Sequence, residues 1–198
     1  MENGEHEYTP LTGQFPPRST SIESFLTDGT DRAFRQMVNT LINISTLVLR
    51  HRDCCGSYLG VSGPQYLMVA TIAQSPTVTV KELARQLDVS PSFVTVEVNK
   101  LIKMQIVEKK QNTLDRRSVL LDLTTKGRRL LVQLGPVREK SNDLMYRSLT
   151  GDQAQVLQDI MDRLVADAKF ALVELERSNG FADRTKPVIG NRLRMLSL

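Results

Sequence analysis

Residues 80–127 read VKELARQLDVSPSFVTVEVNKLIKMQIVEKKQNTLDRRSVLLDLTTKG, and this stretch decides the fold. It also carries the positive charge of the chain. Residues 80–129 hold eleven Lys and Arg against six Asp and Glu, a net charge of +5, whereas the rest of the chain has a net charge of −1. Charge concentrated in one segment is the electrostatic footprint expected of a surface that binds phosphate.

The first half of this stretch predicts two short helices joined by a turn. Thr79 and Glu82 have the spacing of a capping box, in which each side chain binds the backbone amide of the other residue. Ser90 and Pro91 are preferred at the cap and at the first position of the helix that follows. The i, i+4, i+7 rule predicts that Val94, Val98 and Leu101 are buried, and that Ser92, Val96, Asn99 and Lys103 point outward, flanked by Thr95 and Lys100.

The predicted outward face is short, polar and basic, and its small residues lie toward the N-terminal end. A helix that enters the major groove of DNA needs such a face, because bulky side chains there would hold it away from the base edges. An ordinary solvated helix face can have the same composition. The helix alone therefore leaves both interpretations open.

A β-hairpin is predicted next, with strands at Val107–Gln111 and Ser118–Thr124. The turn between the strands contains Asp115, Arg116 and Arg117. A carboxylate beside two guanidinium groups can hold one of them extended. An extended arginine at a hairpin tip suits the minor groove, whose potential is most negative where A·T tracts narrow it. The apolar residues predicted to alternate toward the core are Val119, Leu121 and Leu123.

Together these residues resemble the MarR family of winged-helix transcription regulators. The resemblance is carried by Ser90–Lys100, by the Asp-x-Arg pattern of Asp115 and Arg117, and by the Leu-Thr-x-x-Gly pattern that ends at Gly127. It implies a mainly α fold with a small β-hairpin wing, in which a winged helix-turn-helix domain joins a helical dimerisation domain. It departs from the family pattern at Phe93 and Val96, which are less polar than usual, and a valine can touch a thymine methyl group.

The resemblance also implies a function. The chain would be a homodimeric, ligand-responsive regulator, usually a repressor, released from pseudo-palindromic double-stranded DNA by a small aromatic or anionic effector. Helix 90–100 would read the major groove, and Arg117, oriented by Asp115, would enter the minor groove. The residues predicted to supply phosphate contacts are Lys81, Lys100, Lys109, Lys110 and Arg116. The predicted DNA-binding residues are Ser90, Pro91, Ser92, Thr95, Val96, Asn99, Lys100, Lys103, Asp115, Arg116 and Arg117.

Long amphipathic helices are predicted on both sides of this stretch. Apolar residues recur at three- and four-residue steps over residues 28–52 and again over residues 156–173, and we expect a twofold mate to cover these seams. Gly56 and Gly60 should break the first helix, whereas the helix after Gly127 should continue past Pro136. We expect a flexible tail at 1–27, a dimerisation region at 28–55 and 125–177, a winged helix-turn-helix domain at 62–124 and a C-terminal tail at 178–198.

Several polar and aromatic residues lie near the junction of the first two predicted helices, where the resemblance places a small-molecule pocket. They are candidates for holding the effector. The alternative is that the arginines are solvated charges and that Tyr66 belongs to the core. The candidates are Arg50, His51, Arg52, Tyr58 and Tyr66.

Cys54 and Cys55 suggest an alternative function on the same scaffold, a regulator that uses these residues as a thiol or metal switch. Neighbouring Cα atoms lie about 3.8 Å apart, closer than a disulfide usually permits, so both are predicted to be free thiols. His51 has helical spacing to both cysteines, but no further ligand is evident nearby. We therefore predict no metal and no cofactor.

The sequence lacks the motifs of other functional classes. The sequence has no plausible catalytic triad, no Gly-rich phosphate loop and no HExxH-type helix, so we predict that it is not an enzyme. A winged-helix dimer that binds other proteins is a third hypothesis, against which the concentrated basic charge argues. We expect a cytoplasmic protein with no membrane partner, because we find neither a secretory signal nor about 18 consecutive apolar residues.

Overall fold

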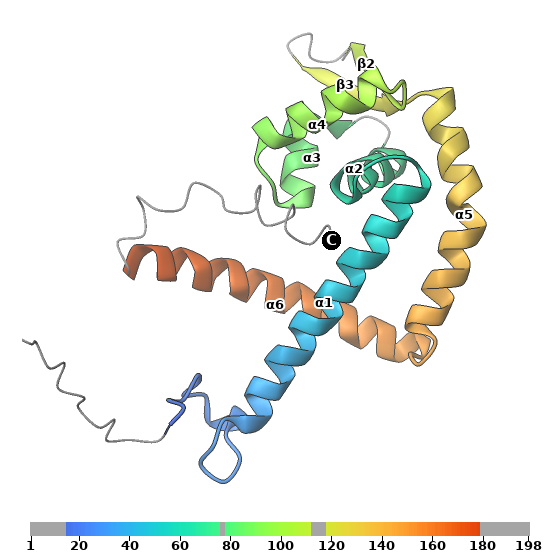
Figure 1. The fold of residues 1–198 in the computed structure, drawn as a ribbon. Coiled ribbons are helices and arrows are strands. Elements are labelled where there is room, and N and C mark those ends of the chain that lie inside the picture. Colours follow the sequence, from blue (N-terminus) through green and yellow to red (C-terminus); the bar gives the residue numbers. More distant parts are fainter. Residues whose placement is uncertain (1–14, 76–77, 112–117, 179–198) are drawn as a thin grey trace, which may run out of the picture. The chain divides into compact units, whose positions relative to one another are not determined.

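The computed structural model describes residues 15–75, 78–111 and 118–178, and Figure 1 draws their helices and strands as a ribbon. The chain divides into two compact units, residues 1–140 and 141–198, and each is described by itself. The predicted mainly helical fold with one small antiparallel sheet is confirmed. The elements are η1 (Glu23–Phe25), α1 (Arg32–Tyr58), α2 (Gly63–Gln74), β1 (Val78–Thr79), α3 (Val80–Leu87), α4 (Pro91–Lys103), β2 (Val107–Gln111), β3 (Val119–Leu123), α5 (Thr125–Tyr146) and α6 (Gly151–Ser178).

Residues 15–31 include the last part of the segment predicted to be a tail, and they fold against the start of α1. The Nε atom of Arg35 donates to the carboxylate of Asp31 at 2.9 Å, and the backbone amide and hydroxyl of Ser19 donate to the same carboxylate at 2.5 and 2.6 Å. These bonds hold the pKa of Asp31 well below its usual range, with Arg35 as the largest cause. The rings of Phe25 and Phe34 lie 5.2 Å apart, so an aromatic contact adds to this junction.

The prediction that Gly56 breaks the first helix is wrong, because Gly56 lies inside α1 and is buried. A Cβ atom there would lie 2.9 Å from the backbone of Ser62, so glycine permits a close approach of two chain segments. The helix ends at Tyr58 instead, and Gly60, with a φ of 72°, follows its C-cap residue Leu59. The amide of Val61 donates to the carbonyl of Gly56 and that of Gly60 to Ser57, which is the Schellman pattern.

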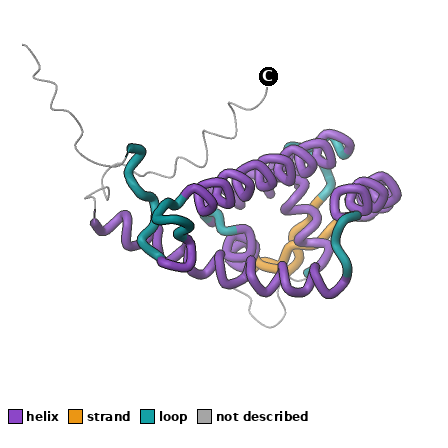
Figure 2. The backbone as a smooth tube through the Cα atoms, turned by 90° about the horizontal axis from the view of Figure 1, so that it is seen from below, coloured by secondary structure: helices purple, strands orange, loops and turns teal. Residues whose placement is uncertain are grey.

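The core of the first unit is enclosed by α2, α3, α4 and the sheet. Its strands have the order β1-β3-β2, with Val78 and Lys109 on either side of Leu121. Helices of the same unit flank this sheet, which is drawn in orange in Figure 2. The largest side chains with less than 2% exposure are Met68, Ile72, Leu83, Leu101, Leu121 and Leu134.

The long helices carry exposed apolar side chains. As predicted, α5 continues through Pro136. In the second unit, Thr150 and Gln153 exchange amide hydrogen bonds of 2.9 and 3.3 Å in a capping box before α6. Among the described residues, no helix has an apolar stretch long enough to cross a membrane. The exposed apolar residues include Leu41, Ile44 and Val48 on α1 and Val156, Ile160, Leu164 and Val173 on α6.

Candidate nucleic-acid interface

Local capping interactions build the helix-turn-helix of α3 and α4. Thr79 and Glu82 form the predicted capping box, in which the amide of Glu82 donates to the Thr79 hydroxyl at 3.2 Å and the amide of Thr79 donates to the Glu82 carboxylate at 2.8 Å. Asp88 adopts the left-handed conformation, with a φ of 54°, and so ends α3. The hydroxyl of Ser90 then accepts from the amide of Phe93 at 3.2 Å and caps α4, as predicted.

The two faces of α4 are divided as the periodicity predicts. Val94, Val98 and Leu101 are at most 1% exposed and belong to the core, so the helix cannot rotate without disrupting it. Val96 is 54% exposed. The other predicted DNA-contacting residues of α4 and its cap are exposed as well, namely Ser90, Pro91, Ser92, Thr95, Asn99, Lys100 and Lys103.

Several polar groups on the outer side of α4 already have intramolecular partners. The hydroxyls of Ser90 and Ser92 share a hydrogen bond of 3.0 Å. The hydroxyl of Thr95 donates to the carbonyl of Pro91 at 2.8 Å, within the helix. The ammonium of Lys109 on β2 donates to the side-chain oxygen of Asn99 at 3.2 Å, which links the wing to α4.

The inner side of α4 contains a charged residue that periodicity did not predict. Glu97 is 9% exposed, and its carboxylate accepts from Gln65 Nε2 at 2.8 Å and from Lys100 at 2.6 Å. The other end of the same Gln65 amide accepts from the amide of Ser62 at 3.0 Å and helps to cap α2. The pair therefore ties the start of α2 to the middle of α4 and leaves no charge of Glu97 without a partner.

The predicted alternation in the second strand is wrong at two positions. Leu121 and Leu123 are buried, but Val119 is 44% exposed and Asp122 is only 5% exposed. A buried carboxylate requires partners. Asp122 accepts from Lys110 on β2 and from Arg128 on α5, both at 2.5 Å. Nothing near Asp122 in the sequence indicates these contacts, because both cations lie on other elements.

Electrostatics at Asp122 favour its charged form. Burial by itself raises the pKa of this carboxyl, but the hydrogen bonds from Lys110 and the Leu123 amide and the charge of Arg128 outweigh burial, so the pKa lies below its ordinary value. The hydrogen bond to Asp122 also raises the pKa of Lys110, which has a second acidic neighbour in Glu108 at 3.4 Å. Lys110, predicted to contact phosphate, is thus held by two carboxylates of the wing strands.

The tip of the wing lies outside the described residues. This applies to the predicted groove-contacting residues Asp115, Arg116 and Arg117. The strands that lead to the tip are described, and they pair antiparallel from Val107↔Leu123 to Gln111↔Val119. The predicted role of the tip stays a prediction.

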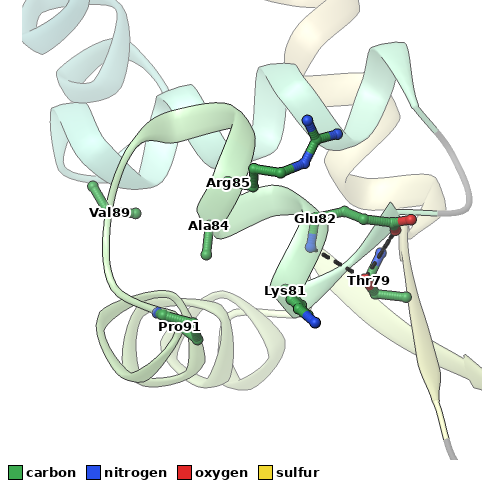
Figure 3. A pocket seen from close by; sticks show the side chains of 7 residues that line it. All are labelled: Thr79, Lys81, Glu82, Ala84, Arg85, Val89 and Pro91. Carbon is green, nitrogen blue, oxygen red and sulfur yellow. Dashed lines mark hydrogen bonds between the residues drawn. The ribbon is translucent and has the colours of Figure 1, made fainter. Parts of the chain in front are cut away.

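A shallow hollow of about 520 Å³ lies between α3 and the start of α4 (Figure 3). Thr79 and Glu82, joined by their capping bonds, line one side of it, and Pro91 lines another. Lys81 and Arg85 contribute two exposed cations from α3. Lys81 was predicted to contact phosphate, whereas Arg85 was missed, although its position one turn after Lys81 could have suggested it.

The candidates for effector binding are spread over surface and core. Arg50 is exposed, and Arg52 pairs with the neighbouring Asp53 at 2.7 Å. Tyr58 is 54% exposed and its hydroxyl donates to the carbonyl of Gln133 at 3.5 Å. His51 is half-buried, and Tyr66 is 8% exposed and belongs to the core. None of the five lines the hollow between α3 and α4.

The two cysteines have different surroundings. Cys54 is exposed, whereas Cys55 is 6% exposed. Burial raises the pKa of the Cys55 thiol, and a hydrogen bond with Tyr66 opposes that rise only in part. Within residues 15–75, 78–111 and 118–178, no three His, Cys, Asp or Glu side chains are placed to hold a metal ion. The metal-responsive alternative thus has no ligand set in the described chain.

Sequence comparison relates this region to known regulators. A family model described as the MarR family matches residues 61–119. An uncharacterized HTH-type transcriptional regulator of Bacillus subtilis, YhbI, is 31% identical over 100 residues, which cover 50% of this chain and 65% of YhbI. The repressor MdtR of the same organism is 32% identical over 68 residues, or 34% of this chain and 44% of MdtR. The matches thus span less than two thirds of these curated relatives.

Comparison of structures shows the same fold. A MarR family regulator from Listeria monocytogenes, solved with a 26mer DNA, has a TM-score of 0.61 and 18% identity, covering 72% of this chain and 95% of that one. MarR from Oenococcus oeni has a TM-score of 0.59 and 17% identity, covering 66% and 98%. At such identities the likeness concerns the fold alone.

Proposed function

Because the chain belongs to the MarR family over residues 61–119, we propose that it is a transcription regulator that binds double-stranded DNA, and not an enzyme. In this proposal α4 enters the major groove and the wing approaches the minor groove. Repression is the expected mode of action, and MdtR, which is similar to this chain, is named a repressor.

The observation that carries the proposal is the exposed face of α4. Val94, Val98 and Leu101 fix the rotation of the helix in the core, so the opposite side chains are presented to solvent in a fixed orientation. Lys103 lies at one end of this face, and Lys81 and Arg85 lie on the neighbouring α3. Cations around a helix face whose N-terminal side chains are small match the requirements of groove binding and phosphate contact.

A homodimer is the second part of the proposal. α1 and α6 each leave apolar side chains in water along most of their length, for example Ile44 and Val48 on α1 and Ile160 and Leu164 on α6. Exposed apolar area of this extent is typical of a surface that a partner covers. A second copy related by a twofold axis would cover equivalent faces and present two α4 helices to half-sites about 34–36 Å apart.

The test begins with DNA fragments selected from random duplexes by the full-length protein. Fluorescence anisotropy of a selected fragment, measured over a range of salt concentrations, should give an affinity that falls steeply with salt. Lys103→Ala should reduce the slope of log K against log salt by about 0.9, the value for one phosphate contact, and Arg117→Ala by a similar amount.

Lys140→Ala is the matched control, because it removes the same charge about 22 Å along α5 from Thr125. It should leave the slope unchanged. Equal slopes for the wild-type protein, Lys103→Ala and Arg117→Ala would remove both α4 and the wing from DNA binding. Sedimentation equilibrium of the same samples measures the oligomeric state, and a monomer that binds the selected DNA with full affinity would contradict the dimer.

Release by a small effector is the third part of the proposal. Aromatic acids and their thioesters would be screened for loss of DNA binding, followed by Arg50→Ala and Tyr58→Phe to test two exposed candidates for the effector site. The thiol-responsive alternative is tested by the Cys54→Ser, Cys55→Ser protein. If that protein still releases DNA normally with the effector, neither thiol takes part.

A further inference from the structure

The centre of the proposed DNA-reading face is an apolar side chain. Val96 is 54% exposed on α4, and its neighbours one turn away on the same side are Ser92, Asn99 and Lys100. Phe93, the other neighbour at that distance, is half-buried and packs against the core. The exposed apolar residues of α1 and α6 recur along each helix, whereas the exposed neighbours of Val96 are polar.

Folding does not explain a valine at this position. A β-branched side chain loses rotamer freedom in a helix and has a lower helix propensity than alanine, lysine or glutamine. Val96 also gains little from burial, since more than half of its surface stays in water. A residue that contributes little to the folded state can contribute when a second surface covers it.

The polar groups beside Val96 are restricted in what they can read. The hydroxyl of Thr95 is bonded to the carbonyl of Pro91, and that of Ser92 is shared with Ser90. These bonds occupy the only donor of Thr95 and one bonding position of Ser92, and so reduce the base groups that either hydroxyl can select.

Asn99 is restricted in a different way. Lysine can only donate, so the contact with Lys109 fixes the side-chain oxygen of Asn99 toward the wing and leaves its NH₂ group as a donor. Recognition of adenine by asparagine needs both the oxygen and the nitrogen of the amide. Asn99 held in this way is therefore suited to base acceptors or phosphate, and not to bidentate recognition of adenine.

We infer that Val96 makes the sequence-specific contact of this face by packing against the 5-methyl group of a thymine in the major groove. The methyl group distinguishes thymine from cytosine at that edge, and apolar side chains are its usual partners. This inference rests on the proposed function, because it requires α4 to enter the groove. In this inference α4 selects thymine, and it does so through the 5-methyl group.

Replacement of thymine by deoxyuridine tests the contact, since it removes the methyl group and keeps every hydrogen-bonding group and phosphate. A fragment selected by the full-length protein would be synthesised with one thymine replaced at a time. Wild-type affinity should fall about fourfold at a contacted thymine, the equivalent of one buried methyl group. Val96→Ala should bind the thymine and uracil forms of that fragment with equal affinity.

Two variants separate this contact from other effects. Val132→Ala makes the same side-chain change at a 75% exposed valine of α5 and should keep the fourfold preference for thymine. Lys103→Ala should weaken binding to both forms by the same factor. Circular dichroism should show that Val96→Ala remains folded, as expected for an exposed position.

The outcomes distinguish the contact from the proposed function. Salt-dependent binding to a selected fragment in which no thymine is sensitive to uracil would overturn the role of Val96 and leave the proposed function standing. A Val96→Ala protein that keeps the full preference for thymine would also overturn it. A protein that selects no DNA and shows no salt-dependent binding would overturn both.

Discussion

Replacement of Gly127 by alanine should destabilise the protein because α5 begins in close contact with the chain that precedes β2. Gly127 is buried, and a Cβ atom there would lie 2.3 Å from the carbonyl oxygen of Ile106 and 3.2 Å from its carbonyl carbon. The neighbouring Thr124 fixes this approach, since its amide donates to Ile106 at 3.1 Å and its hydroxyl donates to the carbonyl of Gln105 at 2.6 Å.

The size of the effect follows from these distances. A carbon atom beside a carbonyl oxygen needs about 3.3 Å, so the two segments must separate by about 1 Å. Overpacking of this kind costs about 1–3 kcal/mol. Weakening the two bonds of Thr124 adds about 0.5–1.5 kcal/mol each. The higher helix propensity of alanine stabilises the folded state by about 1 kcal/mol and offsets part of this cost. We expect a net loss of about 1–5 kcal/mol, with a central value of about 3 kcal/mol that lowers the midpoint of thermal unfolding by on the order of 10 °C.

Urea and thermal unfolding followed by circular dichroism measure this loss. Gly151→Ala is the matched control, because Gly151 also lies in the first turn of a helix but a Cβ atom there would have no heavy atom within 4 Å. Its unfolding free energy should stay the same or rise by up to about 1 kcal/mol, because only the gain in helix propensity applies there. If the Gly127→Ala protein unfolds together with the wild-type protein and the control, the close approach at Ile106 does not explain the glycine of the Leu-Thr-x-x-Gly pattern.

Three further predictions concern the cap of α4, the thiols and the wing. Ser90→Ala removes the acceptor for the first turn of α4 and should cost about 1 kcal/mol in urea unfolding, whereas an unchanged midpoint would discount the cap. A thiol reagent should label Cys54 in the native protein and Cys55 only on unfolding, because Cys55 is buried and its pKa is raised; equal labelling rates by mass spectrometry would contradict this. The lowered pKa of Asp122 contributes stability that is present above its unfolded value of about 3.9 and lost as pH falls through the lower folded value. Urea unfolding should therefore show that the stability advantage of wild type over Asp122→Asn shrinks below about pH 4, and a pH-independent difference would argue against the charge of Asp122.

Local signals in the sequence predicted the parts of the site that depend on neighbouring residues. The capping box of Thr79 and Glu82 and the cap at Ser90 form as predicted, since each involves atoms within three residues along the chain. The buried stripe that contains Val94 and Val98 follows from helix geometry alone. Such features need no knowledge of the tertiary structure.

Contacts between distant elements could not be predicted in this way. Asp122 occupies a strand position that alternation assigns to solvent, yet it is buried because Lys110 and Arg128 reach it from β2 and α5. Glu97 is buried because Gln65 meets it from α2. Gly56 does not end α1, because the chain returns at Ser62 and packs against it. Each case depends on a partner that is brought close only by the fold.

These distant contacts change the electrostatics of the proposed interface. The formal charge of residues 80–129 is +5, but Lys100 and Lys110 are paired with Glu97 and Asp122. A lysine that leaves a carboxylate for a phosphate gains less than one that leaves water, because it gives up an existing ion pair. In the described chain, Lys81 and Lys103 have no such carboxylate partner and should dominate the salt dependence from α3 and α4. Because phosphate contacts carry no sequence information, selection by α4 must come from groups such as Val96 that face the bases.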